Sequence, residues 1–249
     1  MSKENRPCVA ILGSGPNVIA ARDWSEHPFD KLVVINNAWQ VRPDWDDLVF
    51  PYDFPSDRQP TYLKPQQRLI CEADFVPVQN QYGGFVYAGA TMAFTTAYWV
   101  LGHYNPREIA FLGCDMYYPK TSKTHFYGTG TADPLRQDIT LVSLEAKAAR
   151  LYALALAQGC EITNLSKETS RLIAPRRSLL EPRPKPFKID NMQKTNALAR
   201  EQELAYYVAS GRYWEELERF DTKQIKYLDA LWRNVVSEPM EAPKPTSGH

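Results

Sequence analysis

The sequence predicts an α/β fold in which a mostly parallel sheet lies between helical layers. Short segments that are apolar at every position, at residues 9–12, 32–35 and 109–112, are typical of strands buried on both faces. Each segment is followed by glycine or asparagine, and helix-compatible segments separate the runs. Strand, turn, helix and strand in this order form a βαβ unit, so we expect a Rossmann-like three-layer sandwich.

The first part of the chain is expected to alternate strands with crossovers. Residues 18–31 have the length of a crossover, and Pro28 limits its helix to the first part because proline removes a backbone donor. Residues 48–50 are predicted to be a third strand. The proline-rich segment that follows, up to residue 77, is not expected to hold a central strand, since proline cannot donate to the ladder.

The next part is predicted to place a strand between two helices. Residues 89–101 have apolar positions near helical spacing, and Gly102 stands where a helix C-cap would end them. Residues 139–158 carry one apolar stripe and form the second helix, and residues 160–165 are the last predicted strand. The segment 121–137 is rich in Gly and Thr, so we expect a long irregular loop there.

A proline-rich linker, residues 176–190, is predicted to separate a nucleotide-binding domain, residues 1–175, from a helical hairpin, residues 191–240, and a disordered tail, residues 241–249. Helices are expected at residues 197–209 and 214–236. Their aromatic side chains need a partner surface, which is the sheet domain, a second subunit of a homo-oligomer or a substrate. These side chains are Tyr206, Tyr207, Tyr213, Trp214, Phe220, Tyr227 and Trp232.

Charge and composition argue against several classes of protein. The chain of 249 residues has 29 basic and 29 acidic side chains, whereas general nucleic-acid binders usually present an excess of positive charge. No apolar run approaches the ~18 residues that a membrane span needs, and we expect a cytoplasmic protein because the start lacks a signal-peptide pattern. Four scattered cysteines without CxxC spacing predict reduced thiols.

The turn after the first predicted strand is the strongest local motif. Gly13, Ser14, Gly15 and Asn17 follow a buried strand, and such a turn directs backbone amides toward a phosphate at the following helix N-terminus. The turn is neither the dinucleotide fingerprint, whose third glycine is replaced by Val18, nor a Walker A loop. A tight turn without a ligand is the structural alternative.

Polar side chains follow the other predicted strands as well. Because ligands of open parallel sheets bind outside the carboxyl ends of the strands, we expect these side chains to gather at one rim. Adjacent Asn36 and Asn37 are suited to holding a ribose or a base edge through their amides, or they serve only as turn formers. The predicted rim consists of Ser14, Asn17, Asn36, Asn37, Asp53, Asp115, Tyr117 and Asn164.

The long loop carries most of the candidate catalytic side chains. A histidine side chain ordinarily has a pKa near 6.5, so His125 is a candidate general base, or it serves as a structural or substrate-positioning hydrogen-bond partner. Asp133 and Asp115 are the other candidate bases. Arg136 is suited to pairing with a phosphate or a carboxylate, and Thr129 and Thr131 add hydroxyl groups. A loop of this length is commonly functional, so we expect a lid or an acceptor-binding loop, with a segment that caps the next helix as the alternative.

These motifs resemble those of the small bacterial CMP-sialic-acid-dependent sialyltransferases. The resemblance extends to the related group that includes archaeal 6-hydroxymethylpterin diphosphokinase and motility accessory glycosyltransferases, and it covers residues 9–172 in patches. The family's strand-terminal glycine turn is similar to residues 13–17, and its strand-terminal asparagine matches Asn36 or Asn37. Its Gly-x-Asp-Phe-Tyr motif is similar to residues 113–117, and its His-Tyr-x-Gly-His motif is similar to residues 125–129.

The resemblance implies a nucleotide-sugar donor, such as a CMP-sugar, and roles for further residues. Asp53 corresponds to an asparagine near the donor, and Thr91 begins a helix beside the nucleotide. Tyr117 and Tyr127 would assist the leaving phosphate. The family's second histidine, its proposed general base, is replaced here by Thr129, which cannot take a proton near neutral pH.

Three functions follow as hypotheses from the sequence. The first is transfer of a sugar from a nucleotide-activated donor to a hydroxyl acceptor, with His125 or Asp133 as base. The second is ATP-dependent diphosphate transfer to a pterin-like alcohol, which would need Mg²⁺. Asp53, Asp115 and Asp133 are candidate ligands for that ion, although the sequence does not require a metal. The third is a non-catalytic protein that binds a nucleotide or a partner protein.

Overall fold

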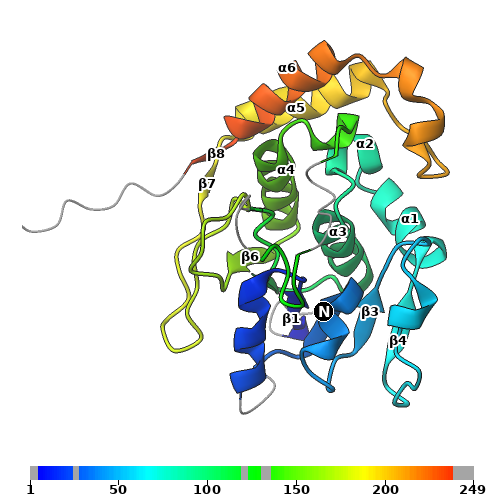
Figure 1. Ribbon diagram of the computed structural model, residues 1–249. Helices are drawn as coiled ribbons and strands as arrows, with labels where there is room; N and C mark the ends of the chain where they lie inside the picture. Colours follow the sequence, from blue (N-terminus) through cyan, green and yellow to red (C-terminus); the bar gives the residue numbers. More distant parts are fainter. Residues whose placement is uncertain (1–4, 25–27, 119–122, 130–135, 238–249) are drawn as a thin grey trace, which may run out of the picture.

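The centre of the protein is a six-stranded parallel sheet (Figure 1). The structure is a computed structural model and describes residues 5–24, 28–118, 123–129 and 136–237. The strand order is β4-β3-β2-β1-β5-β6, and all five strand pairs are parallel. The strands are β1 (Cys8–Leu12), β2 (Lys31–Ile35), β3 (Asp47–Val49), β4 (Arg68–Ile70), β5 (Glu108–Leu112) and β6 (Glu161–Asn164).

Helices cover both faces of this sheet, which confirms the predicted Rossmann-like α/β architecture. Side chains alternate along β1, so that Val9 and Ile11 join the core beneath the α-helices, and Ala10 and Leu12 join the opposite core. One face carries α1 (Glu72–Asn80), α3 (Met92–Tyr104) and α4 (Leu144–Ala157), with the short α2 (Phe85–Ala88) beside them. The 3-10 helices η2 (Pro16–Asp23) and η3 (Asn36–Gln40) lie on the other face.

Several elements differ from the sequence prediction. The first crossover is a 3-10 helix that ends at Asp23, and the proline-rich segment holds the 3-10 helix η4 (Ser56–Arg58), the edge strand β4 and α1, which includes Pro77. Helix α3 continues through Gly102 and ends at Asn105 in the left-handed region. A Cβ at Gly102 would lie 2.4 Å from Val78 Cγ1, so this glycine serves the close packing of α1 on α3 and not a helix end.

The predicted helix at residues 139–158 is divided. The 3-10 helix η6 (Ile139–Leu141) comes first, and α4 begins after Ser143, whose hydroxyl accepts from the Ala146 amide. The chain then returns to the sheet as β6. Asp138 is the N-cap of η6, because its side chain accepts from the Thr140 amide at 2.7 Å.

The C-terminal part is a helical pair that packs on α4 across the top of the molecule in Figure 1. Its helices are α5 (Asn191–Leu204) and α6 (Thr222–Arg233), with the 3-10 turns η7 (Tyr213–Glu215) and η8 (Leu217–Arg219) between them. The second predicted helix is therefore shorter, because Asp221 caps α6 by accepting from the Lys223 amide. The strands β7 (Lys188–Ile189) and β8 (Val236–Ser237) join the two ends of the pair in an antiparallel ladder.

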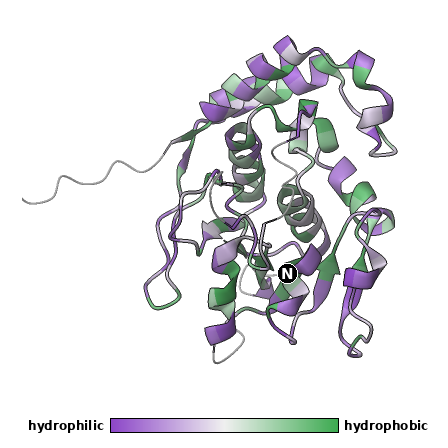
Figure 2. Cartoon of the chain, in the orientation of Figure 1, coloured by the Kyte–Doolittle hydropathy of each residue, from purple (hydrophilic) through white to green (hydrophobic). Residues whose placement is uncertain are grey.

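Two buried ion pairs connect this helical pair to α4. Arg150 Nε lies 2.7 Å from Glu201 Oε1, and Lys147 Nζ lies 2.9 Å from Asp229 Oδ1. The Trp232 indole donates to the same Glu201 oxygen at 2.8 Å. Figure 2 shows the matching division of hydropathy, with α3 and α4 largely hydrophobic and α5 and α6 mixed. The helical pair thus shares one hydrophobic core with the sheet region.

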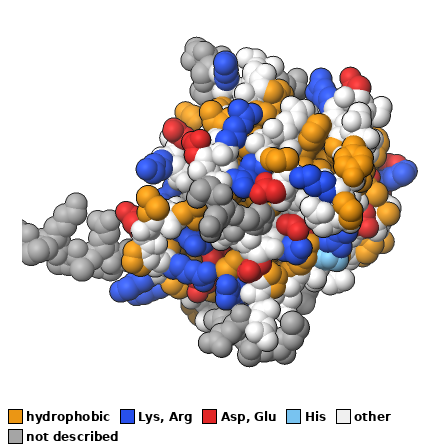
Figure 3. Space-filling model, turned by 90° about the horizontal axis from the view of Figure 1, so that it is seen from below, with side chains coloured by type: hydrophobic (Ala, Val, Ile, Leu, Met, Phe, Trp, Pro, Cys, Tyr) orange, Lys and Arg blue, Asp and Glu red, His pale blue; other side chains and the backbone are white. Residues whose placement is uncertain are grey.

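The predicted tail, residues 241–249, lies outside the described residues. No described helix has the length and apolar character of a membrane span. On the face viewed in Figure 3, basic and acidic side chains are interspersed, in keeping with the balanced charge of the sequence.

Candidate functional site

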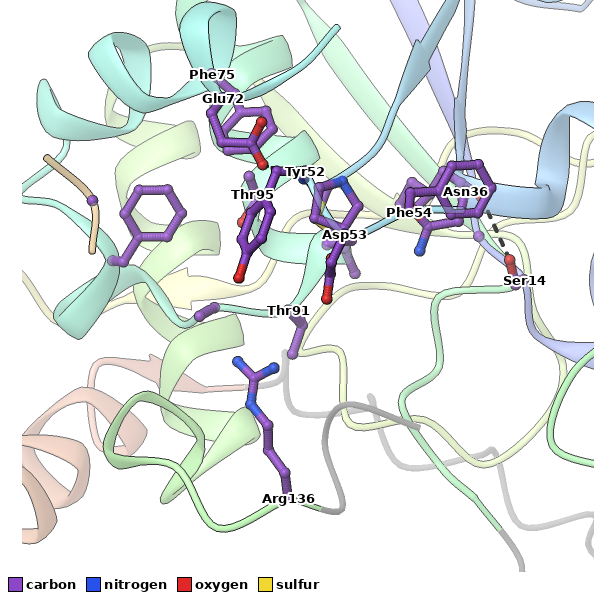
Figure 4. A pocket seen from close by; sticks show the side chains of 18 of the residues that line it. Ser14, Asn36, Tyr52, Asp53, Phe54, Glu72, Phe75, Thr91, Thr95 and Arg136 are labelled. Carbon is purple, nitrogen blue, oxygen red and sulfur yellow. Dashed lines mark hydrogen bonds between the residues drawn. The ribbon is translucent and has the colours of Figure 1, made fainter. Parts of the chain in front are cut away.

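A cleft of about 1070 Å³ opens at the carboxyl ends of the central strands. The register aligns Leu12 of β1 with Val34 of β2 and Leu112 of β5, so the loops after all three strands begin at one edge. From β1 the chain continues on one side of the sheet and from β5 on the other, and open α/β sheets bind ligands at such a switch point. Figure 4 shows part of the lining.

The cleft contains ten of the predicted site residues. Its polar lining comes from loops that are far apart in the sequence, as the sequence analysis expected for the rim. It also includes aromatic and charged side chains that the sequence analysis did not select as site residues. The predicted residues that line it are Gly13, Ser14, Gly15, Asn36, Asn37, Asp53, Thr91, His125, Tyr127 and Arg136.

The glycine turn after β1 packs against the loop after β5. The Gly13 amide donates to the Leu112 carbonyl and the Gly15 amide donates to the Gly113 carbonyl, both at 2.8 Å. A Cβ at Gly13 would lie 2.4 Å from the Gly113 oxygen. The expectation that these amides face a phosphate is therefore wrong for Gly13 and Gly15, because both already have backbone partners. The glycines permit the close approach of the loops, and Ser14 is the polar group of the turn that lines the cleft.

Asn36 and Asn37 follow β2 directly and lie beside Ser14. The Ser14 hydroxyl donates to the Ile35 carbonyl at 3.4 Å, which places the turn next to the end of β2 (Figure 4). Asn36 has a φ of 50°, in the left-handed region, and its buried Oδ1 has no hydrogen-bond partner among the described residues. An unsatisfied buried acceptor costs about 1–3 kcal/mol. Such a residue is typical of a functional position.

The N-terminus of α3 is directed toward the middle of the cleft. Thr91 is its N-cap and accepts from the Phe94 amide at 3.3 Å. The positive end of the helix dipole therefore lies at the lining, where it favours a negative ligand group. Arg136 points toward the same region from the opposite side of the cleft (Figure 4).

His125 and Tyr127 belong to a tight turn that packs on the glycine turn. The backbone groups of His125 and Gly128 exchange two hydrogen bonds, at 3.0 and 3.1 Å, and the Phe126 amide donates to the Ser14 carbonyl. His125 Nδ1 lies 2.9 Å from the Thr124 hydroxyl, and its ring stacks on Tyr127 with centroids 5.0 Å apart. These contacts fix the imidazole at the lining.

Asp115, a predicted catalytic residue, does not line the cleft. It is buried, and its carboxylate accepts from Asn17 Nδ2 at 2.7 Å and from Asn164 Nδ2 at 3.2 Å, with Arg176 at 3.8 Å. Asn17 also donates to Ser166. Asp115, Asn17 and Asn164 thus connect the ends of β5 and β6 to η2, which corrects their assignment to the binding rim.

Of the remaining predicted residues, Tyr117 and Thr129 are exposed and do not contribute to the lining. Thr131 and Asp133 lie outside the described residues. Within the described part of the chain, no three His, Cys, Asp or Glu side chains are grouped as a metal site.

One wall of the cleft was not predicted from the sequence. Residues 210–215, between α5 and α6, line it together with Tyr52, Glu72, Phe75 and Phe85. Trp214 belonged to the aromatic stripe considered for substrate contact, but nothing in the stripe distinguished it from its buried neighbours.

Comparison with known proteins identifies no relative of this chain. No protein-family model, curated protein or solved structure matches the chain.

Proposed function

We propose that this protein transfers a sugar from a nucleotide-activated donor to a hydroxyl acceptor. The observation that supports this most directly is the convergence of Ser14, Asn36, Thr91 and His125 on one cleft at the sheet's switch point. The cleft of about 1070 Å³ slightly exceeds the usual range for small-molecule sites, ~300–1,000 Å³. It therefore has room for two substrates side by side.

The strand end of the cleft suits the nucleotide. Asn36, Asn37 and Ser14 offer amide and hydroxyl groups that both donate and accept, as a ribose and a base edge require. The α3 N-terminus and Arg136 lie further along, where positive potential would stabilise the phosphate as it leaves. Tyr127 adds a phenol group near His125.

His125 is the proposed general base. When Nδ1–H donates to the Thr124 hydroxyl, Nε2 carries the lone pair that accepts the proton of the acceptor hydroxyl. The acceptor oxygen then bonds to the anomeric carbon of the donor while the bond from that carbon to the phosphate oxygen breaks. Base assistance of this kind is worth about 10² to 10⁴ in rate.

The donor site is tested by thermal shift with CMP, UDP, GDP and ATP, with and without Mg²⁺. A nucleotide at a hundredfold excess over its Kd stabilises the folded state by about 2.7 kcal/mol. Asn36→Gly should abolish the shift, since glycine keeps the left-handed backbone and removes the amide. Asn105→Gly is the matched control, because Asn105 has a φ of 45° and lies outside the cleft.

Two results would count against sugar transfer. Stabilisation by ATP alone, with an absolute need for Mg²⁺, would favour the diphosphokinase hypothesis. Absence of a shift with every nucleotide would remove the donor site. For the base, His125→Ala should lower turnover of the preferred donor by about 10²-fold or more at unchanged nucleotide affinity, and equal turnover at saturating donor would eliminate His125.

A further inference from the structure

The far end of the cleft is closed by residues 210–215, which belong to the C-terminal helical pair. The backbone of this segment packs closely against side chains of α1 and α2. Gly211 has a φ of 77°, and a Cβ there would lie 2.9 Å from Phe85 Cε2 and 3.2 Å from Val76 Cγ2. Two residues before Gly211, the Ala209 carbonyl accepts from Asn80 Nδ2 of α1 at 2.7 Å. The segment is therefore a fixed wall of the cleft.

A hydrogen-bonded cluster fixes the same wall to the segment that carries Arg136. The Tyr213 hydroxyl donates to Asp138 Oδ2 at 2.6 Å and accepts from Arg136 Nη2 at 3.1 Å. Arg136 Nε also donates to Asp138 Oδ2, at 3.0 Å. Tyr213 is only 3% exposed, so its ring is an anchor, whereas the neighbouring Trp214 remains available to a ligand.

Three exposed aromatic side chains line this cleft, and one of them, Tyr127, stacks on His125 at the strand end. Trp214 is 47% exposed and packs at 79° against the Tyr213 ring, which orients its indole. Tyr52, on the loop after β3, is 73% exposed. Each offers an apolar surface, and a ligand that covers this surface excludes water from it, which stabilises the complex.

The charged lining is balanced, which indicates the kind of ligand. Three arginines and three carboxylates line the described cleft, and within residues 210–215 the charges pair with each other, since Arg212 Nη1 lies 3.4 Å from Glu215 Oε1. This end of the cleft therefore offers an anionic ligand little net attraction. A sugar ring fits this combination, because its C–H face packs on an aromatic ring while its hydroxyls both donate and accept. The charged lining residues are Asp53, Arg58, Glu72, Arg136, Arg212 and Glu215.

We infer that the end of the cleft formed by residues 210–215 is a subsite for a neutral carbohydrate, with Trp214 as its stacking surface. Its role as the acceptor subsite rests on the proposed sugar transfer, since the nucleotide occupies the strand end near Asn36. Carbohydrate binding at Trp214 stands independently of that transfer. The subsite would deliver one sugar hydroxyl toward the middle of the cleft.

The test is saturation-transfer NMR on the full chain with lactose, maltose and N,N′-diacetylchitobiose as neutral probes. The anionic probe is 3′-sialyllactose, and 6-hydroxymethylpterin is the flat aromatic probe. We expect a neutral probe to bind, and Trp214→Ala to weaken it about tenfold. Trp214→Phe should restore most of the affinity. Tyr227→Ala is the matched control, because Tyr227 is an exposed aromatic residue of α6 that does not line the cleft.

Nucleotide-induced stabilisation is measured in the same variants and separates the two proposals. If it persists in Trp214→Ala while neutral-sugar affinity falls, the subsite is supported. If no nucleotide stabilises the protein but a neutral sugar binds through Trp214, sugar transfer fails and the subsite stands. The subsite is overturned if no neutral probe binds, if affinity survives in Trp214→Ala, or if the anionic or pterin probe is preferred.

Discussion

Replacing Tyr213 by Phe removes one oxygen from the cluster that anchors the cleft wall. The ring remains to fill its buried position, so the change isolates the hydroxyl group. That hydroxyl donates to the Asp138 carboxylate at 2.6 Å and accepts from Arg136 at 3.1 Å. The variant therefore leaves Asp138 with fewer donors and Arg136 with a weaker anchor.

The expected cost in stability follows from these contacts. A hydrogen bond to a charged group contributes about 1.5–3 kcal/mol. Asp138 keeps Arg136 Nε, the Thr140 amide and the Thr140 hydroxyl as donors, so a value toward the lower end, about 2 kcal/mol, is expected. For a chain of this size that corresponds to a fall in Tm of about 4–8 °C.

The pH dependence provides a stricter test. Burial alone raises the pKa of Asp138, but hydrogen bonds from Tyr213 and Thr140 outweigh it and lower the pKa below its ordinary 3.8. A carboxyl group with a lowered pKa in the folded state stabilises the protein above its ordinary pKa. This stabilisation is lost as the pH falls through the lower value. The deficit of Tyr213→Phe should be constant between about pH 5 and 8 and shrink below about pH 4.

Urea unfolding at several pH values measures this difference in free energy. An unchanged m value shows that the denatured state is comparable in the two proteins. A deficit that is as large at pH 3 as at pH 7 would refute an interaction with ionised Asp138. A deficit near zero throughout would mean that the cluster does not anchor the wall.

Two further outcomes test the core. Glu201→Gln leaves the buried Arg150 guanidinium without its counter-ion and should cost about 3–5 kcal/mol in urea unfolding, whereas Glu203→Gln, in an exposed pair with Arg200, should stay within about 0.5 kcal/mol. A small loss for Glu201→Gln would show that the pair is not buried in solution. Iodoacetamide should label the half-buried Cys71 first, because Cys8, Cys114 and Cys160 are buried and burial raises the pKa of Cys160 to about 12. Mass spectrometry of the native protein reads this out, and early labelling of Cys114 would contradict the packing beneath the glycine turn.

The central parallel strands were predictable because they are buried on both faces. An apolar side chain at nearly every position of β1, β2 and β5 distinguishes these segments from half-exposed strands. The edge strand β4 lacks this signal, since two of its three residues, Arg68 and Leu69, are exposed. Helix α1 was concealed by Pro77, because a proline inside a helix removes a backbone hydrogen bond and so usually indicates a helix end.

The candidate site was predictable to the extent that strand ends determine it. Ser14, Asn36 and Asn37 lie within two residues of the ends of their strands, so the direction of the chain places them at the rim. Asp115 lies three residues beyond β5, after Gly113 and before Met116, both with positive φ, and these turns direct its carboxylate to Asn17 and Asn164. Strand position alone does not carry information about such turns.

The contribution of the C-terminal segment depended on long-range packing. The predicted helix from residue 214 would have made Trp214 its first residue and left Tyr213 outside it. The structure places them in the 3-10 turn η7, where Tyr213 is buried and Trp214 is exposed. The contacts of Gly211 with Phe85 and Val76, together with the hydrogen bond from Tyr213 to Asp138, show where this turn lies.

The ion pairs between α4 and the last fifth of the chain bear on how the protein is made. Until α5 and α6 leave the ribosome, Arg150 and Lys147 have no counter-ions, and burying them would be unfavourable. A fragment cut at residue 175 would keep every strand of the large sheet yet expose the surface of α4. Expression of the isolated sheet region should therefore give insoluble material, and the complete fold can form only after synthesis is almost finished.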